Sequence, residues 1–302
     1  MKYEIIPFSD HLYLICLEPP IPGFDHFLGT WLYKGGDPFI VDPGPKVTSG
    51  LLIDALTALD VKQLSHILLT HIHIDHAGGI GEIAGHFGDA SIICHADGIP
   101  HLVKPEKLYE GSVKTLGKTA QIYGPIAPVP ENRFIPAQGF SHPEITPIIT
   151  PGHAAHHVSY MANGHLFAGE AGGVSLPVKE GGLYLRPATP PRFFMETYVK
   201  SIDDLIRMNP ATICYGHFGL REDGRAMLEK NRAQLFLWKE TIAKALKDHG
   251  ENTDRYAAIT RLLLESDPNL AGFSSLDEAA KERERGFIKN SIMGFEGYLK
   301  KS

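Results

Sequence analysis

Four residues with metal-binding side chains lie within the segment LLTHIHIDHAGG, at His71, His73, Asp75 and His76. The apolar run HILLT before them predicts a strand, in which alternate side chains share a face. His71 and His73 can therefore bind one metal ion. Asp75 lies a step further on and His76 breaks the alternation, so this pair can turn toward a second, adjacent ion. A single H-x-H often arises by chance, but the order H-x-H-x-D-H predicts a metal site.

Three more candidate ligands follow apolar, strand-like runs further along the chain: His153 after ITPIITPG, Glu170 after GHLFAG and His217 after ATICYG. Strands of an α/β sheet that end in ligands place those ligands together at one edge. Histidine and carboxylate ligands suit zinc, iron or manganese, and the absence of nearby cysteines excludes a structural thiolate site. We predict two divalent metal ions, with zinc favoured over iron and manganese.

The segments that must position these residues alternate between two patterns. Short runs rich in β-branched and aromatic residues and ended by Gly or Pro predict strands, as in HLYLICLE, TWLYKGG, PFIVDPG and SIICHA. Helical spacing appears at 49–60 and, more weakly, at 77–88. Strands alternating with helices predict a layered α/β fold. Two irregular stretches, 98–136 (with room for one short helix) and 172–195, could form functional loops or, more plainly, exposed packing loops.

The pattern becomes helical after His217. Helical spacing extends over three segments: 223–249, 254–266 and 276–300. Gly250 is placed to end the first of these helices. We therefore predict an α/β domain at 1–221 and a helical C-terminal extension at 222–302. The extension could help to bind substrate, form a homodimer interface or brace the first domain.

Composition and charge exclude several classes of protein. The chain has 302 residues and a formal charge of -6, so it lacks the basic footprint of a protein that binds nucleic acid or an anionic membrane. No apolar run reaches the roughly 20 residues that span a bilayer. Glu4, Asp10 and His11 interrupt the apolar N-terminal segment that a secretory signal needs. The three cysteines lie in apolar runs, as buried free thiols do, so we expect a cytoplasmic protein. We expect its partner to be a small-molecule substrate.

At its candidate ligands the sequence resembles the metallo-β-lactamase superfamily. H-x-H-x-D-H at 71–76, PGH at 151–153 and YGH at 215–217 occur in that family's order, and VDPG at 41–44 resembles its early strand and turn. The resemblance covers roughly residues 10–220. It implies an α/β fold of the αββα type, a four-layer sandwich in which helices flank two mixed β-sheets.

The same resemblance implies two sets of ligands: His71, His73 and His153 for the first metal, and Asp75, His76 and His217 for the second. The residue at position 170 would bridge the two ions. The family normally has an aspartate there, whereas this chain has Glu170, whose carboxylate is carried on a stem one methylene longer. Glu170 could still bridge both ions or could bind only one of them.

Two divalent ions about 3.5–4 Å apart would hold a bridging water and lower its pKa toward neutrality. The metal-bound hydroxide could then attack a carbonyl, with Asp75 orienting it as well as binding metal. We predict a metal-dependent hydrolase that cleaves an ester, thioester, lactone or amide, similar to glyoxalase II in its C-terminal helices. Two alternatives remain: a mononuclear-iron oxidoreductase similar to persulfide dioxygenases, which share this fold, and a catalytically silent metal-binding protein.

Other side chains are candidates for supporting roles. Four of them could contact the substrate: His26, Tyr184, Arg186 and Arg192. His156 or His157 could fix the tautomer of a metal-binding histidine. Asp42 is expected to form hydrogen bonds near the metal loop rather than to bind metal.

Overall fold

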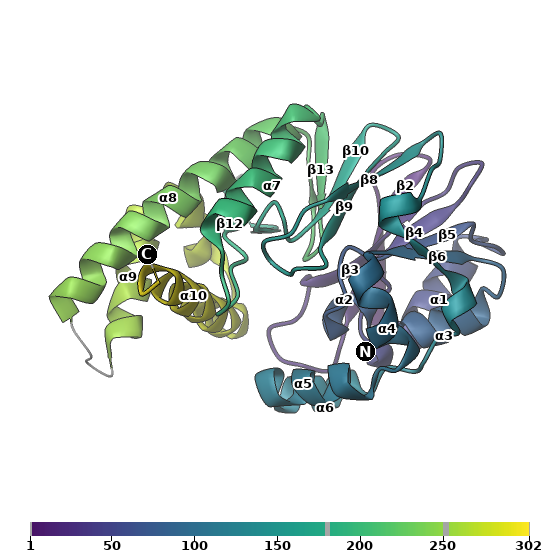
Figure 1. Cartoon of the computed structure of the whole chain (residues 1–302), viewed down its shortest axis with the longest axis horizontal. Coiled ribbons are helices and arrows are strands. Elements are labelled where there is room, and N and C mark those ends of the chain that lie inside the picture. The colour runs from purple at the N-terminus through teal and green to yellow at the C-terminus, as the bar shows by residue number, and fades with distance from the viewer. Residues whose placement is uncertain (1, 179–181, 250–253, 302) are drawn as a thin grey trace.

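The computed structural model describes residues 2–178, 182–249 and 254–301, and two β-sheets face each other at its centre (Figure 1). The first sheet contains, in spatial order, β1 (Lys2–Pro7), β2 (Leu12–Glu18), β3 (Leu28–Tyr33), β4 (Phe39–Val41), β5 (His66–Leu68), β6 (Ser91–Cys94) and β7 (Phe134–Pro136). Strands β1 to β4 pair antiparallel, and β4 to β7 pair parallel.

The second sheet contains, in spatial order, β14 (Leu220–Arg221), β13 (Thr212–Tyr215), β10 (His165–Gly169), β9 (Val158–Ala162) and β8 (Ile145–Ile149). Only its β10–β13 pair is parallel among the described strands. Both sheets are therefore mixed, as predicted. A separate hairpin joins β11 (Val174–Leu176) to β12 (Tyr184–Arg186).

Strand β2 shows how one apolar run serves two layers. Leu14 and Cys16 are fully buried and belong to the core between the sheets, together with Phe167 from the second sheet. Ile15 and Leu17 alternate with them and face the core on the helix side. Because successive side chains of a strand point to opposite faces, a strand buried on both faces must be apolar throughout.

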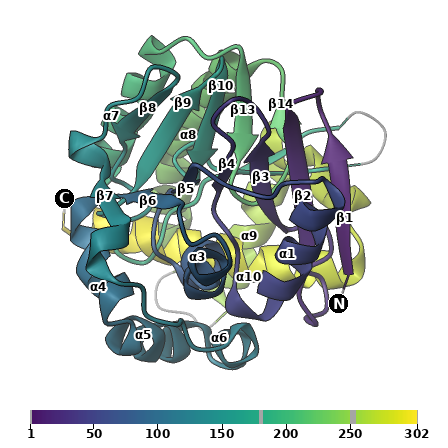
Figure 2. The same cartoon turned by 90° about the vertical axis from the view of Figure 1, so that its right-hand side faces the viewer.

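Helices complete the outer layers (Figure 2). On the first sheet lie α1 (Ser49–Ala58) and α3 (Ile80–His86), and α2 (Ile74–Ala77) forms the turn before α3. Against the second sheet lie α7 (Met195–Arg207) and α8 (Gly224–His249). The order helix, sheet, sheet, helix confirms the predicted four-layer sandwich.

The C-terminal region is helical, as predicted. Its helices are α8, α9 (Arg255–Ser266) and α10 (Glu278–Leu299), which pack on one another. Leu228, Leu235, Trp238 and Ile242 of α8 are fully buried, as their spacing indicates. The predicted helix end at Gly250 lies outside the described residues. The division of the chain into 1–221 and 222–302 stays a prediction.

The stretch 98–136 is more regular than predicted. It forms three short helices, α4 (Ile99–Val103), α5 (Glu106–Leu116) and α6 (Lys118–Tyr123), before β7. None of the eleven residues of α5 is buried, although its apolar residues Leu108, Tyr109, Val113 and Leu116 recur at helical spacing. Among the described residues, no helix is long and apolar enough to cross a membrane.

Candidate metal centre

The H-x-H-x-D-H motif occupies the turn between β5 and α3, at the end of a largely buried strand. His71 and His73 lie in the connecting loop, and Asp75 and His76 lie in α2. Gly78 allows this compact turn, because a Cβ atom there would collide with the carbonyl oxygen of Ile74. The four side chains consequently gather at one edge of the first sheet.

The second sheet supplies the other three candidate ligands. His153 lies in the β8–β9 loop, Glu170 follows β10 directly, and His217 follows β13. Gly169, just before Glu170, has φ +54°, and a Cβ atom there would lie 2.5 Å from Nε2 of His157. Glycine is therefore needed at this position both for its backbone conformation and for close packing.

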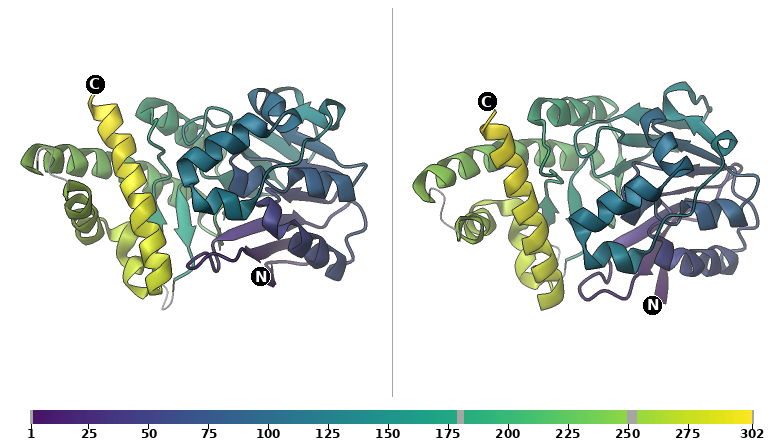
Figure 3. Two further views of the ribbon diagram at one scale, coloured as in Figure 1. Left: turned by 90° about the horizontal axis from the view of Figure 1, so that it is seen from below. Right: turned by 60° about the horizontal axis from the view of Figure 1, so that its bottom comes forward.

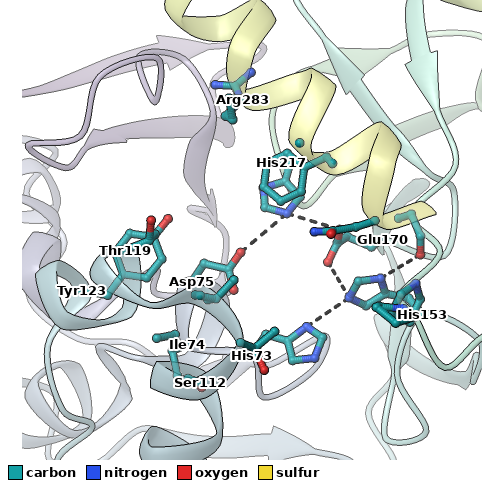
Figure 4. A pocket seen from close by; sticks show the side chains of 18 of the residues that line it. His73, Ile74, Asp75, Ser112, Thr119, Tyr123, His153, Glu170, His217 and Arg283 are labelled. Carbon is teal, nitrogen blue, oxygen red and sulfur yellow. Dashed lines mark hydrogen bonds and ion pairs between the residues drawn. The ribbon is translucent and has the colours of Figure 1, made fainter. Parts of the chain in front are cut away.

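The structure brings all seven predicted side chains together. Figure 4 labels five of them: His73, Asp75, His153, Glu170 and His217. The Oε2 atom of Glu170 lies 2.8 Å from Nε2 of His153 and 3.4 Å from Nε2 of His71. The other oxygen, Oε1, lies 3.3 Å from Nε2 of His217. Asp75 Oδ2 lies 3.7 Å from that same His217 nitrogen. Glu170 thus stands between two groups of donors.

Two groups of donor atoms are each small enough to surround one ion. The donors within each group lie within 4.8 Å of one another: His71, His73, His153 and Glu170 in the first, and Asp75, His76 and His217 in the second. Nε2 of His71 and Nε2 of His76 are buried without a hydrogen-bond partner among the described residues. Buried polar atoms are rarely left unpaired, so these atoms fit a metal ion. Imidazole and carboxylate donors suit zinc, iron or manganese.

Three of the histidine rings are held by hydrogen bonds through Nδ1. His71 contacts Oγ1 of Thr70 at 3.0 Å, and His76 contacts Oδ2 of Asp42 at 3.0 Å. His153 contacts the carbonyl oxygen of Ala188 at 2.9 Å. An Nδ1 atom that is occupied in this way fixes the tautomer and turns Nε2 toward the donor cluster.

Asp42 forms hydrogen bonds with the loop that carries the H-x-H-x-D-H motif, as predicted. Its Oδ1 accepts a hydrogen bond from the backbone N–H of Thr70 at 2.8 Å, and its Oδ2 accepts one from the Thr70 hydroxyl at 2.6 Å. The same Oδ2 atom contacts His76. One buried carboxylate therefore links the backbone of the loop to the ring of a candidate ligand.

His157 supports the cluster through the backbone. Its Nε2 accepts a hydrogen bond from the N–H of Glu170 at 3.1 Å, so its Nδ1–H donates to Oγ1 of Thr150 at 2.8 Å. Burial and the nearby His153 lower the pKa of His157 well below its usual range, which keeps the ring neutral. Of the two predicted supporting histidines, His157 thus holds the position of Glu170, while His156 lines the cavity described below.

His217 is held in a different way. Its Nδ1 atom is buried without a hydrogen-bond partner among the described residues. Its ring instead stacks on Phe27, with centroids 4.3 Å apart and an interplanar angle of 15°. The guanidinium of Arg283 from α10 lies 3.9 Å from the centroid of the Phe27 ring. Neither residue carries a local sequence signal, because Phe27 meets His217 and Arg283 meets Phe27 only through the tertiary fold.

The charges of the cluster favour an ionised carboxylate. Burial alone would raise the pKa of Glu170, but His153 and His217 outweigh it and hold the pKa well below its usual range. Burial alone would lower the pKa of His76. The neighbouring carboxylates outweigh burial and raise this pKa to about 9, and Asp75 has the largest effect among them. In the absence of metal, the cluster therefore pairs anionic carboxylates with histidines.

A cavity of about 1290 Å³ opens over the cluster and reaches the C-terminal helices. Among the four predicted substrate contacts, Arg186 lines this cavity, but its Nε donates to Oε2 of Glu284 at 2.5 Å. The hydroxyl of Tyr184 donates to the same oxygen at 2.7 Å. His26 pairs with Glu4 at 2.9 Å. Neither His26 nor the exposed Arg192 is among the described residues that line the cavity.

Comparison with known proteins places these observations in a family. The sequence profile of the metallo-beta-lactamase superfamily matches residues 30–217. The metallo-beta-lactamase fold-containing protein ST1585 of Sulfurisphaera tokodaii is 28% identical over 188 residues, which are 57% of this chain and 70% of that protein. A hydroxyacylglutathione hydrolase of Aeromonas salmonicida is 31% identical over 161 residues, 50% of this chain. This match spans 48% of the hydrolase, about half of its length.

Solved structures share the fold. A structure of ST1585 superposes with a TM-score of 0.67 at 23% identity and covers 95% of this chain and 99% of that one. The metallo-beta-lactamase family protein TTHA1429 from Thermus thermophilus gives a TM-score of 0.63 at 21% identity, with 98% and 95% covered. With its sandwich fold and the profile match over most of its length, the chain belongs to the metallo-beta-lactamase superfamily.

Proposed function

We propose that this protein is a two-metal hydrolase that cleaves a thioester, ester or lactone. The observation that carries the proposal is the position of Glu170, with one carboxylate oxygen toward His153 and His71 and the other toward His217. A carboxylate that faces two groups of donors can bridge two ions. The longer stem of glutamate is therefore compatible with the bridging role for which relatives use aspartate.

Two divalent ions bound to these residues would polarise a substrate carbonyl and lower the pKa of a bound water. The chain itself contributes orientation. The Asp75 carboxylate lines the cavity, where it can accept a hydrogen bond from the attacking water and hold it in place. Ile72, Ile74 and Phe27 form an apolar surround that limits access of bulk water and strengthens the electrostatic interactions inside.

The similarity to hydroxyacylglutathione hydrolases supports thioester cleavage as the first reaction to test. It covers only about half of those enzymes, so their substrate does not carry over directly. A small-molecule substrate, and no nucleic acid, is the partner in this proposal, and the α10 wall of the cavity supports a substrate-binding role for that helix. A cytoplasmic location and a homodimer stay predictions.

The test is a panel of thioesters, esters and lactones assayed with zinc- or manganese-loaded protein, with chelator-treated protein and with Glu170→Gln. The glutamine keeps the shape of the side chain but removes its charge. We expect hydrolysis by the loaded protein, loss of activity with chelator, and a fall of roughly a hundredfold or more in Glu170→Gln. Oxygen consumption with a persulfide, together with one equivalent of iron and no hydrolysis, would overturn the proposal.

A further inference from the structure

Helices α5 (blue-teal in Figure 3) and α10 (yellow) both line the cavity. The lining residues of α5 recur at helical spacing: Leu108, Gly111, Ser112, Thr115 and Leu116. Those of α10 do the same: Arg283, Gly286, Phe287, Asn290 and Met293. Each helix thus presents one continuous face to the cavity rather than a single side chain. Over α5 this face extends for about 12 Å, at 1.5 Å per residue.

These two faces combine apolar and small side chains with charged ones, since Lys107 of α5 and Glu282 and Lys289 of α10 also line the cavity. Leu116 is 38% exposed and Met293 is 37% exposed, so each offers apolar surface within the cavity that a ligand could cover. Gly111 and Gly286 leave open space, since a Cβ atom at either position would meet no described atom within 4 Å. The cleft between the helices therefore has room for a ligand and a surface that an apolar ligand would cover.

The cleft is continuous with the metal centre. The same cavity is lined at its inner end by Asp75, His153 and His217, with Ile72 and Ile74 beside them. A substrate whose reacting carbonyl lies at the cluster must therefore extend its remaining part along α5 and α10. A cavity of about 1290 Å³ is larger than a reacting group alone requires.

Three positively charged groups that line the cleft have partners. Arg186 and Arg283 contact the two oxygens of Glu284, at 2.5 and 2.9 Å. Lys289 lies 5.8 Å from the ring centroid of Tyr256. Because Glu284 forms ion pairs with both arginines, their positive charges do not require an anionic substrate group between the helices.

We propose that the cleft between α5 and α10 binds the long apolar acyl chain of the substrate, an inference that rests on the proposed hydrolase function. The substrate class is then a medium- or long-chain acyl thioester or ester, with its carbonyl at the cluster and its alkyl chain between Leu116 and Met293. Each methylene that enters the cleft leaves water and strengthens transition-state binding by roughly two- to fourfold.

The experiment measures kcat/KM for thioesters of one thiol, N-acetylcysteamine, from acetyl to dodecanoyl. In the unaltered protein we expect kcat/KM to rise by at least about tenfold over the series. Gly286→Leu fills the open space in the cleft and raises helix propensity, so the fold is retained. It should lower the ratio of kcat/KM for dodecanoyl to that for acetyl by about tenfold. Gly85→Leu is the matched control, because Gly85 is an exposed α3 glycine with open space outside the cavity.

A binding measurement separates failure of the cleft from failure of the reaction. Calorimetric titration of dodecanoate into chelator-treated protein should show binding that Gly286→Leu weakens and Gly85→Leu does not. Hydrolysis that is equally fast at every chain length, or dodecanoate binding unchanged in Gly286→Leu, would overturn the inference and leave the hydrolase proposal intact. Dodecanoate binding without any hydrolysis would support the cleft and overturn the hydrolase proposal.

Discussion

His76 and His217 serve the same group of donors, but the protein holds their rings by different means. The ring of His76 is fixed by Asp42, a buried carboxylate that also holds the loop backbone through Thr70. The ring of His217 has no such partner among the described residues and lies flat against Phe27. A hydrogen bond fixes rotation of an imidazole, whereas stacking fixes only its plane. We therefore expect His217 to be the more easily disturbed of the two.

The two histidine rings are also held by different parts of the chain. Asp42 and Thr70 belong to loops of the first sheet, the same sheet whose edge carries the motif they hold. Phe27 comes from an N-terminal loop, and Arg283 above it comes from α10. The C-terminal helices thus reach the metal centre through one aromatic ring, which ties the condition of the site to their packing.

Asp42→Ala removes the hydrogen bonds that hold His76 and should have the largest effect of the substitutions considered. It removes the acceptor of two Thr70 donors and the partner of His76, all of them buried. We expect the free energy of unfolding to fall by about 3–5 kcal/mol and the metal affinity to fall by about 10–100-fold. Urea unfolding and metal content after dialysis measure both. Thr70→Ser keeps the hydroxyl and should change each less. Stability and metal content that survive Asp42→Ala would show that His76 is fixed by another group.

Phe27→Leu removes the stacking that supports His217. Leucine keeps an apolar side chain in the buried position but removes the flat surface under His217. Stacked aromatic pairs contribute about 0.5–1.5 kcal/mol, so we expect one metal equivalent to bind roughly three- to tenfold more weakly while the other is unchanged. Titration with a chelator that competes for the metal measures the two steps. Phe24→Leu is the control, since Phe24 contacts Phe27 without stacking on His217. Equal weakening of both ions would contradict a local role for the ring.

Arg283→Met should sharpen the comparison with a smaller effect. It removes the cation over Phe27 and leaves Glu284 with Arg186 and Tyr184 as partners. We expect about a twofold weakening at the same metal and a moderate loss of stability, because a cation–π contact contributes about 1 kcal/mol. A double-mutant cycle with Phe27→Leu measures whether the two act together. Strictly additive effects on metal affinity would show that Arg283 does not act through Phe27.

Cys16→Ala should have the smallest effect on metal binding. Cys16, Glu18 and His26 also lie close enough to surround an ion. Burial, together with the nearby Glu18, raises the pKa of the Cys16 thiol to about 12, which disfavours the thiolate that binds metal. Elemental analysis of Cys16→Ala should therefore match that of the unaltered protein. A lost metal equivalent would move one ion away from the histidine cluster.

The sequence indicates which side chains gather at the cluster, because these residues carry local signals. His71, His73, Asp75 and His76 are adjacent in one motif, and the structure places them beside Glu170. The long helix α8 is equally predictable, since its buried residues repeat at helical spacing. These features depend on short segments whose pattern matches their burial.

Other features depend on contacts between distant segments. Helix α5 buries none of its eleven residues, and Pro105, Gly111 and Gly117 in and around it hide the helical spacing of its apolar residues. Tyr184 is a predicted substrate contact, yet its hydroxyl binds Glu284 of α10. The ring of Phe27 meets His217 only after both sheets and the C-terminal helices have assembled. Sequence patterns indicate which residues are buried, but not which partner each one meets.

The most direct test of the two-metal centre is the metal content per chain, measured by elemental analysis of protein purified without added metal, for the unaltered chain and for Glu170→Gln. We predict about two equivalents of zinc, iron or manganese in the unaltered chain and no more than about one in Glu170→Gln, as loss of a bridge requires. Two equivalents in both proteins would show that Glu170 is not the bridge. One equivalent or none in the unaltered chain would contradict the two-metal centre itself.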